Sequence, residues 1–420
     1  MSGRRAPRRP GHRVLNLAIA LAAGGAIVTL ALALVVGGAD LIRAPARALP
    51  DPVPPGQDSL RHRLDEYLAL VLERHEVPGL AVAVVMDGEV AYVGAFGVAS
   101  LSAPTPVTPE SVFHLASVSK VFVATAILQL VERELIHLTV PVVEVLPYFR
   151  LDDPRYTQIT VEQLLSHTSG MPDVRDYEWD APEYDAGALE RYVRSLEDWK
   201  LRSAPGESLR YSNTAFEVLG DIVAKVSGVP FEEYVKTHIL EPLDMRSSTF
   251  LTPEVDASLR TAPHRCRLVP GPRETFPYNR AHGPSSTLQS NVVDMARWAL
   301  AMLARGELDG QRVLSDESFD EMWKPRVVIR SDRQMGLAWI LGDRRGMPFY
   351  THGGRDPGFA AGFILLPEPR IGVIVLSNCD ATPVGPILKA VTDIALGHSP
   401  EIPPVPLMAR LARGWRDLWE

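Results

Sequence analysis

Strand-like runs lie near both ends of this 420-residue chain, and their separation constrains the fold more than any other feature. Near the beginning, GLAVAVVMDGEVAYVGAFGVA reads as two strands that meet at Asp87-Gly88, because both turn residues tolerate positive φ. Three further strand-like runs lie near the other end, at residues 335–341, 359–366 and 371–377. Strands far apart in the sequence must therefore pair with one another.

The region between these strands, about residues 110–330, reads mostly as helix and loop. Asn291, with Asp294 three residues later, predicts a helix start within it. An apolar stripe predicts another helix from about Leu60, and a last one is expected around residues 386–396. The sequence thus predicts an α+β (mixed α/β) fold, with an antiparallel sheet flanked by terminal helices and a helical subdomain.

The first 39 residues have the composition of a membrane-targeting segment. Residues 1–13 hold five arginines and no acid, and residues 14–39 are uncharged over 26 positions. A cleavable signal has an apolar region of about 7–15 residues, whereas a spanning helix needs about 20. Length therefore favours a transmembrane anchor behind a basic cytoplasmic tail, with a long signal peptide as the alternative. We expect a single-pass protein of the cell membrane with its body exported, or a secreted one after cleavage.

Three further segments complete the expected domain organisation. Residues 40–58 are rich in proline and predict a semi-extended linker. A folded domain is expected over residues 59–397. Residues 398–420 are predicted to hold a Pro-rich segment and an amphipathic helix that docks on its own domain, with a membrane surface as the alternative. Its apolar face would consist of Leu407, Leu411, Trp415 and Leu418.

Charge and cysteine content exclude some functions. The net charge is -8, and without the five leading arginines 38 basic residues face 51 acidic ones, so nucleic acid is not an expected partner. No CxxC, HExxH or Cys/His cluster occurs, so we expect no metal and no cofactor. The spacing of Cys266 and Cys379 favours two unpaired thiols, with a disulfide as the alternative.

The segment HLASVSKVFVAT places Ser117 three residues before Lys120 at the start of an apolar run. Residues three apart share one face of a helix, so the two side chains should point the same way. Desolvation favours the neutral form of a buried amine, and a neutral amine can accept the proton of a serine hydroxyl. A helix beginning at Ser117 would also direct free backbone N–H groups at its oxygen. The structural alternative is a capping serine beside a lysine that reaches solvent.

Two later segments carry residue types that fit the same chemistry. RYSNTAFEVLG contains Tyr211, whose phenol could act as a general base beside an ammonium, and Asn213, whose amide could orient a substrate amide. HGGRDPGFAAGFILLP begins with His352, and Gly353 and Gly354 would allow backbone donors to approach a substrate closely. A buried tyrosine, a capping asparagine and a tight glycine turn are the structural alternatives.

Together, these motifs resemble the serine β-lactamase and penicillin-recognising hydrolase family. The branch that the chain is most similar to comprises class C-related esterases, D-peptidases and carboxypeptidases. The sequence between the motifs is also similar to that of the family, in ITVEQLLSHTSGMP (159–172) and EPLDM (241–245). The motifs that carry the resemblance are, in order, Ser117-Val118-Ser119-Lys120, Tyr211-Ser212-Asn213 and His352-Gly353-Gly354.

The resemblance implies a role for each motif residue. Ser117 would be the acylated nucleophile, and Lys120 would keep the groups that exchange protons around it in the reactive state. Tyr211 would transfer protons to the leaving group and from a hydrolytic water. On the substrate-binding side, Asn213 would orient the substrate amide. The glycine motif would line the cleft, and the backbone N–H groups of Ser117 and Arg355 would form an oxyanion hole.

One departure from the family pattern shapes the expected function. β-Lactamases usually carry Lys-Thr-Gly where this chain has His352-Gly353-Gly354. Histidine is largely neutral near pH 7, so the cationic anchor for a β-lactam carboxylate is weakened. We therefore expect a serine hydrolase of small-molecule or short-peptide esters or amides, of esterase or D-amino peptide type. The alternatives are D-alanyl-D-alanine carboxypeptidase or β-lactamase activity, and a non-catalytic binding or assembly protein.

Two other features have a structural and a functional interpretation. His167, in LLSHTSG, is expected to be structural rather than catalytic. Residues 173–185, DVRDYEWDAPEYD, hold six acids and are expected to form a solvated loop. The functional alternative is an acidic lid over the cleft that favours cationic or amine-bearing substrates.

Overall fold

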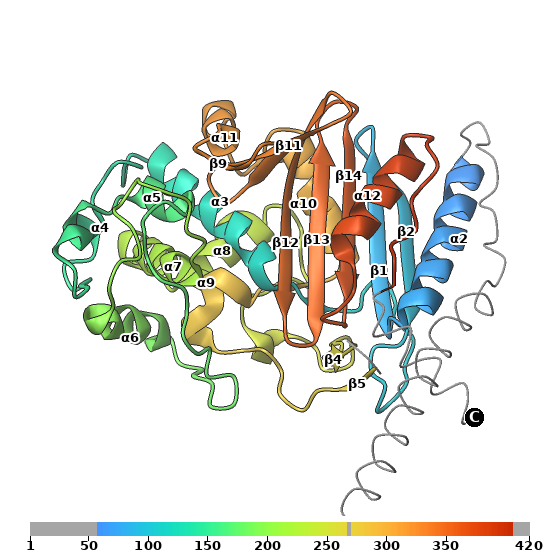
Figure 1. The fold of residues 1–420 in the computed structure, drawn as a ribbon, viewed down its shortest axis with the longest axis horizontal. Coiled ribbons are helices and arrows are strands. Elements are labelled where there is room, and N and C mark those ends of the chain that lie inside the picture. The colour runs from blue at the N-terminus through green and yellow to red at the C-terminus, as the bar shows by residue number, and fades with distance from the viewer. Residues whose placement is uncertain (1–56, 267–269, 406–420) are drawn as a thin grey trace, which may run out of the picture. The chain divides into compact units, whose positions relative to one another are not determined.

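A computed structural model describes residues 57–266 and 270–405. Its centre is an eight-stranded antiparallel sheet in the order β2-β1-β14-β13-β12-β11-β10-β9 (Figure 1). Strand β1, from the beginning of the described chain, pairs with β14 from its end, as predicted. The strands are β1 (Gly79–Met86), β2 (Glu89–Gly97), β9 (Val327–Arg330), β10 (Arg333–Met335), β11 (Ile340–Arg344), β12 (Met347–Asp356), β13 (Phe359–Leu366) and β14 (Ile371–Ser377).

The turn chemistry that predicted the first hairpin is confirmed. Asp87 and Gly88 join β1 to β2 with φ of 52° and 87°, the left-handed region that a two-residue hairpin requires. The prediction of one strand over 335–341 is wrong, because the run is divided between β10 and β11. Ala338 has φ of 66°, and Gly336 donates its N–H to the Trp339 carbonyl, so the chain turns where continuous pairing was expected.

The two faces of the sheet are covered by different helices. Alternate side chains point to opposite faces of a strand, and in β1 Val82 and Val84 pack in one core whereas Ala81 and Ala83 pack in the other. The terminal helices α2 (Gln57–His75) and α12 (Val384–Ala395) cover the first face. Helix α10 (Val292–Leu303) covers the second face, with Asn291 as its predicted N-cap, accepting from Asp294 N at 2.8 Å.

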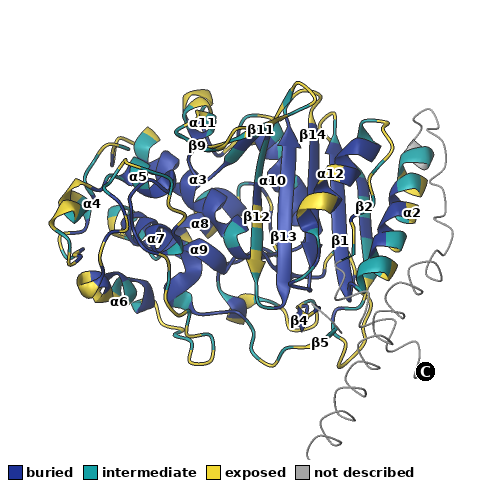
Figure 2. Ribbon diagram, in the orientation of Figure 1, coloured by how far each residue is buried: buried dark blue, intermediate teal, exposed yellow. Residues whose placement is uncertain are grey.

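The helical region lies beside the sheet on the side of β12, and α3 lies at their junction (Figure 1). Residues 119–130 of α3 are all buried, which makes it the central helix of the larger core (Figure 2). The helices of this region are α3 (Ser119–Glu132), α4 (Val142–Val145), α5 (Val161–Leu165), α6 (Ala188–Arg194), α7 (Asn213–Ser227), α8 (Phe231–Val235), α9 (Gly283–Ser286) and α11 (Asp316–Trp323).

The preference for two unpaired thiols is wrong, because Cys266 and Cys379 form a disulfide with their Cα atoms 5.9 Å apart. The pairing follows from a long-range contact. His264, in the short strand β4 (His264–Arg265), forms a parallel bridge with Cys379, which brings the two cysteines together across 113 residues. Sequence spacing carries no signal for such a contact.

Several predicted segments lie outside the described residues. These are the basic tail (1–13), the apolar stretch (14–39), most of the linker (40–58) and the C-terminal amphipathic helix (407–419). Helix α2 begins at Gln57, so it includes the last two residues assigned to the linker. Within the described ranges, no helix has both the length and the apolar character needed to cross a membrane.

Candidate active site

Ser117 lies in a single 3₁₀ turn, η1 (Ala116–Val118), and α3 begins two residues later than predicted. Ala116 has φ of 49°, a conformation that an L-residue rarely adopts and that prevents α3 from extending backwards. The Ser119 hydroxyl fixes the junction, because it donates to the Ala116 carbonyl at 2.7 Å and accepts from Leu288 N at 3.0 Å. The turn therefore holds Ser117 just ahead of the helix N-terminus.

Lys120 is completely buried, and each N–H of its ammonium has an acceptor. Its Nζ donates to Ser117 Oγ at 3.1 Å, to Asn213 Oδ1 at 2.6 Å and to the Ser285 carbonyl at 2.8 Å. The structure thus brings together three of the predicted site residues. It adds Ser285, which the sequence analysis did not identify.

Tyr211 joins this group through its aromatic ring. The Lys120 ammonium lies 5.1 Å from the ring centroid, and the residue is 42% exposed. His167 also contacts this ring, because its own ring stacks on that of Tyr211 with centroids 4.2 Å apart. The Tyr211 ring therefore contacts the buried His167 and the Lys120 ammonium, and the residue is also open to solvent.

His167 is buried and accepts a hydrogen bond from Ser212 N at its Nδ1, over 3.2 Å. Burial, with smaller contributions from Lys120 and His352, lowers the pKa of His167 well below its ordinary value. The ring is therefore neutral, with its proton on Nε2. These contacts hold the backbone after Tyr211 in place.

His352 lies in β12 and is only 3% exposed. Its Nδ1 donates to the Gly353 carbonyl at 2.9 Å, and its buried Nε2 has no partner among the described residues. Burial and the neighbouring Lys120 lower the pKa of His352 to about 3. The ring is therefore neutral at physiological pH, so it adds no positive charge to the site.

The free edge of β12 lies against the turn that carries Ser117. Strand β11 pairs with β12 only as far as Thr351, and the rest of β12 contacts η1. A Cβ at Gly354 would lie 2.1 Å from the Leu115 carbonyl and 2.9 Å from Ser117 N, so only glycine permits this approach. Gly353 and Arg355, on either side, are exposed, and Figure 2 shows this exposed part of β12.

Two acids that the sequence analysis missed, one buried and one half-buried, contact the segments around the site. Glu217 is completely buried and accepts from Ser285 Oγ at 2.5 Å, from Ser285 N at 3.2 Å and from His282 Nδ1 at 3.2 Å. Glu217 follows Asn213 by four residues on α7. Because residues four apart lie on the same face of a helix, this spacing could have predicted that Glu217 lies near the site. A second acid, Asp356 of β12, pairs with His114 at 2.7 Å.

The acidic loop 173–185 reaches the site through its first residue. Asp173 Oδ1 accepts from Asn213 N at 2.8 Å and from Asn213 Nδ2 at 2.9 Å. Further along the loop, Glu183 and Asp185 pair with Arg191 instead. The predicted solvated loop thus contributes one carboxylate to the site.

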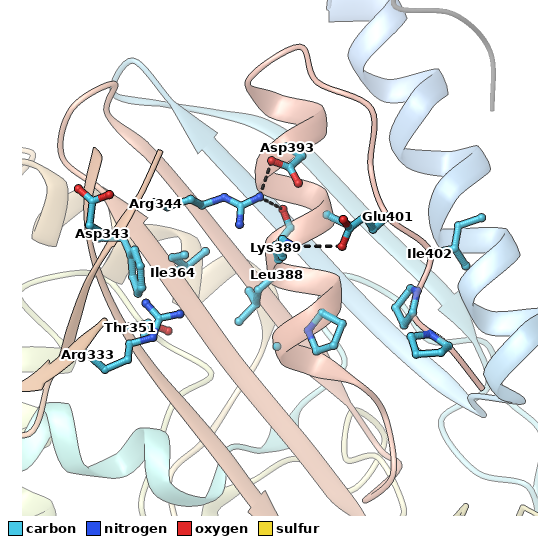
Figure 3. Close-up of a pocket in the computed structure, with 16 residues that line it drawn as sticks. Arg333, Asp343, Arg344, Thr351, Ile364, Leu388, Lys389, Asp393, Glu401 and Ile402 are labelled. Atoms are coloured by element: carbon cyan, nitrogen blue, oxygen red, sulfur yellow. Dashed lines mark hydrogen bonds and ion pairs between the residues drawn. The ribbon is translucent and has the colours of Figure 1, made fainter. Parts of the chain in front are cut away.

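A pocket of about 470 Å³ lies elsewhere, on the face of the sheet that α12 covers (Figure 3). Four of its charged side chains form two ion pairs, Arg344 with Asp393 and Lys389 with Glu401. The residues that line it include none of the predicted site residues. The contacts of Ser117, rather than this pocket, therefore locate the candidate active site.

Comparisons with known proteins agree with this geometry. A family model described as Beta-lactamase matches residues 60–395. Over 329 residues, the chain is 31% identical to penicillin-binding protein 4 of Amycolatopsis lactamdurans, covering 76% of this chain and 84% of that protein. It is 22% identical to protein flp of Staphylococcus aureus (strain MW2), over 80% of this chain and 67% of the relative.

Solved structures give the same result for the fold. The octameric penicillin-binding protein homologue from Pyrococcus abyssi aligns with a TM-score of 0.71 and 29% identity, over 83% of this chain and 80% of that one. A penicillin-binding protein from Bacillus halodurans aligns with a TM-score of 0.64 and 23% identity, over 78% and 98% respectively. The second likeness concerns the fold alone.

Proposed function

Because this chain belongs to the beta-lactamase family, we propose that it is a serine hydrolase that acts through an acyl-enzyme on Ser117. The observation that carries the proposal is the 3.1 Å contact between Lys120 Nζ and Ser117 Oγ, made by an ammonium that is completely buried. A buried charge beside a hydroxyl is costly, and it is typical of sites where that hydroxyl reacts.

In the proposed acylation, Tyr211 acts as the phenolate, a form that the nearby Lys120 ammonium favours. Ser117 Oγ attacks the substrate carbonyl carbon, and its proton passes to this phenolate. Tyr211 then returns this proton to the leaving alcohol or amine as the carbonyl–heteroatom bond breaks. In deacylation, a water loses a proton to the Tyr211 phenolate that this transfer regenerates, and the water oxygen attacks the acyl carbon. The proton then returns to Ser117 Oγ.

The carbonyl oxygen needs donors where its negative charge develops. The backbone N–H groups of Ser117 and Arg355 are assigned this role. The support is the close contact between β12 and η1 at Gly354, which brings the two backbone segments together. The Arg355 guanidinium donates to the Thr382 carbonyl at 3.3 Å, so its charge is held by another contact.

The substrate class that we propose is an ester or amide of esterase or D-amino peptide type. The neutral His352 supports it, because a substrate carboxylate would find no cation at that position. The similarity to penicillin-binding protein 4 favours a second candidate, a D-alanyl-D-alanine carboxypeptidase or β-lactamase activity. We further propose that residues 14–39 anchor the domain on the exported side of the membrane.

A substrate panel tests the proposal. It comprises p-nitrophenyl esters, nitrocefin and D-amino peptides, assayed on the wild type and on Ser117→Ala. Ester or D-amino peptide turnover that disappears in Ser117→Ala is the expected result, and nitrocefin turnover would favour the second candidate. Turnover undiminished in Ser117→Ala, or folded wild type that turns over nothing, contradicts the proposal, and the latter result would favour a binding or assembly protein.

A further inference from the structure

The carboxylate of Asp173 is connected to the nucleophile through a short chain of contacts. Its Oδ1 accepts from the backbone and side-chain nitrogens of Asn213, whose Oδ1 accepts from Lys120 at 2.6 Å. Lys120 in turn contacts Ser117. Asp173 is exposed, so its carboxylate lies at the solvent side of this chain.

The charge of Asp173 is unpaired within the described part of the chain, where each of its hydrogen-bond donors is an uncharged N–H. The third donor, besides the two of Asn213, is Val174 N at 2.9 Å. By contrast, Glu183 and Asp185 of the same loop pair with Arg191. Asp173 therefore offers a fixed negative charge that a ligand can neutralise.

Of the three basic residues of the site, Arg355 donates through its guanidinium to the Thr382 carbonyl at 3.3 Å, and the other two add no accessible positive charge. Lys120 is enclosed by its three acceptors, and His352 is buried and neutral. Neither presents a positive charge to an incoming substrate. The Asp173 carboxylate, by contrast, is hydrogen-bonded to the amide of Asn213 and adds a negative charge there. A cationic group near the acyl carbonyl would thus meet an attractive partner.

We propose that Asp173 determines specificity, favouring substrates whose acyl group carries a protonated amine next to the scissile carbonyl. This inference rests on the proposed function, and it names the substrate class as amino acid esters and amides, or peptides, with a free amino group. Acylation of that amine removes the positive charge and enlarges the group, so the N-acylated forms are the disfavoured class.

The test uses D-alanine p-nitroanilide and N-acetyl-D-alanine p-nitroanilide as a matched pair of substrates. Binding of each compound is also measured independently of its turnover, from how far it slows the labelling of Ser117 by a fluorophosphonate. Asp173→Asn keeps an oxygen that can accept from Asn213 while removing the charge. Asp176→Asn is the matched control, because Asp176 is exposed in the same loop and its Oδ1 accepts from Glu178 N at 2.9 Å.

We expect the wild type to favour the free amine, and Asp173→Asn to lose about tenfold of that preference, which corresponds to 1.4 kcal/mol. The loss should appear in KM and in protection rather than in kcat, with Asp176→Asn unchanged. An equal preference in the wild type and Asp173→Asn, with Ser117 still labelled, overturns this inference alone. Failure of Ser117 to be labelled, with no turnover of either substrate, overturns the proposed function as well.

Discussion

Lys120 donates to Ser117 Oγ at 3.1 Å from a position with no solvent exposure. The ammonium is held there by Asn213 Oδ1 and the Ser285 carbonyl, which come from segments 93 and 165 residues further along the chain. Three separate parts of the sequence therefore converge on one charged group. The reactivity that we assign to Ser117 depends on this convergence.

Replacing Lys120 with methionine should remove the charge while keeping most of the side-chain volume. We expect acylation of Ser117 to slow by about 100-fold or more, because without the ammonium Tyr211 is a poorer base and general-base catalysis is worth about this much. The rate of fluorophosphonate labelling measures this, with near-UV circular dichroism to verify the fold. Lys225→Met, which alters an exposed lysine on a different helix, α7, is the control. Labelling of Lys120→Met at the wild-type rate would show that the ammonium is dispensable.

Gly354→Ala should displace the turn that carries Ser117, because the new Cβ would lie 2.1 Å from the Leu115 carbonyl. We expect ester hydrolysis to fall by about 100-fold, the cost of misplacing reacting groups by about 1 Å. Gly353→Ala is the comparison, since its Cβ would meet Ala361 O at 3.7 Å, an ordinary contact. A smaller loss is expected there, and equal losses in the two variants would contradict the steric explanation.

The stability of the domain should fall in mild acid because of His352. Its folded pKa of about 3 lies below its ordinary value of 6.5, so below pH 6.5 the unfolded chain binds a proton that the folded protein does not. The contribution of His352 to the free energy of unfolding is therefore complete above pH 6.5. It is lost as the pH falls from 6.5 towards 3, and the loss at pH 5 is about 2 kcal/mol.

Urea unfolding at pH 7.5 and pH 5.0 measures this effect. The free energy of unfolding of His352→Gln should fall by about 2 kcal/mol less than that of the wild type between the two pH values. His167, whose pKa is also lowered, chiefly by burial, remains in both proteins, so most of its effect on the pH dependence is common to them. An identical pH dependence in the two proteins would show that His352 does not titrate in this way.

Glu217 is predicted to position the Ser285 carbonyl against Lys120. Glutamine at this site has one acceptor oxygen for three donors, so we expect turnover to fall by about tenfold in Glu217→Gln. Asp221→Asn is the matched control, because Asp221 is a buried acid on the same helix that accepts from Tyr148 at 2.8 Å, away from the site. Turnover of Glu217→Gln within twofold of the wild type would exclude this positioning role.

Local signals predicted the parts of the fold that depend on neighbouring residues. The hairpin at Asp87-Gly88, the Asn291 cap and strands β13 and β14 all follow from turn chemistry, capping and apolar runs. The error over 335–341 arose because the positive φ of Ala338 is imposed by tertiary contacts, including its N–H bond to the Leu165 carbonyl. Apolar pattern cannot reveal such a turn.

The candidate site was predictable only where its members are close in sequence or fall in motifs. Ser117 and Lys120 share a short segment, whereas Ser285 and Glu217 meet across 68 residues through buried hydrogen bonds. The disulfide between Cys266 and Cys379 was missed for the same reason. His352 is buried because its side chain lies on a covered face of β12. The residue type alone does not predict on which face of the strand the side chain lies.

The central claim is that Ser117 Oγ becomes a covalent acyl carrier, and intact-mass spectrometry after fluorophosphonate treatment tests it most directly. The account predicts one adduct per chain, located on the peptide that contains Ser117 and absent from Ser117→Ala. Folded wild-type protein that stays unmodified at saturating reagent, or an adduct that persists in Ser117→Ala, would contradict it.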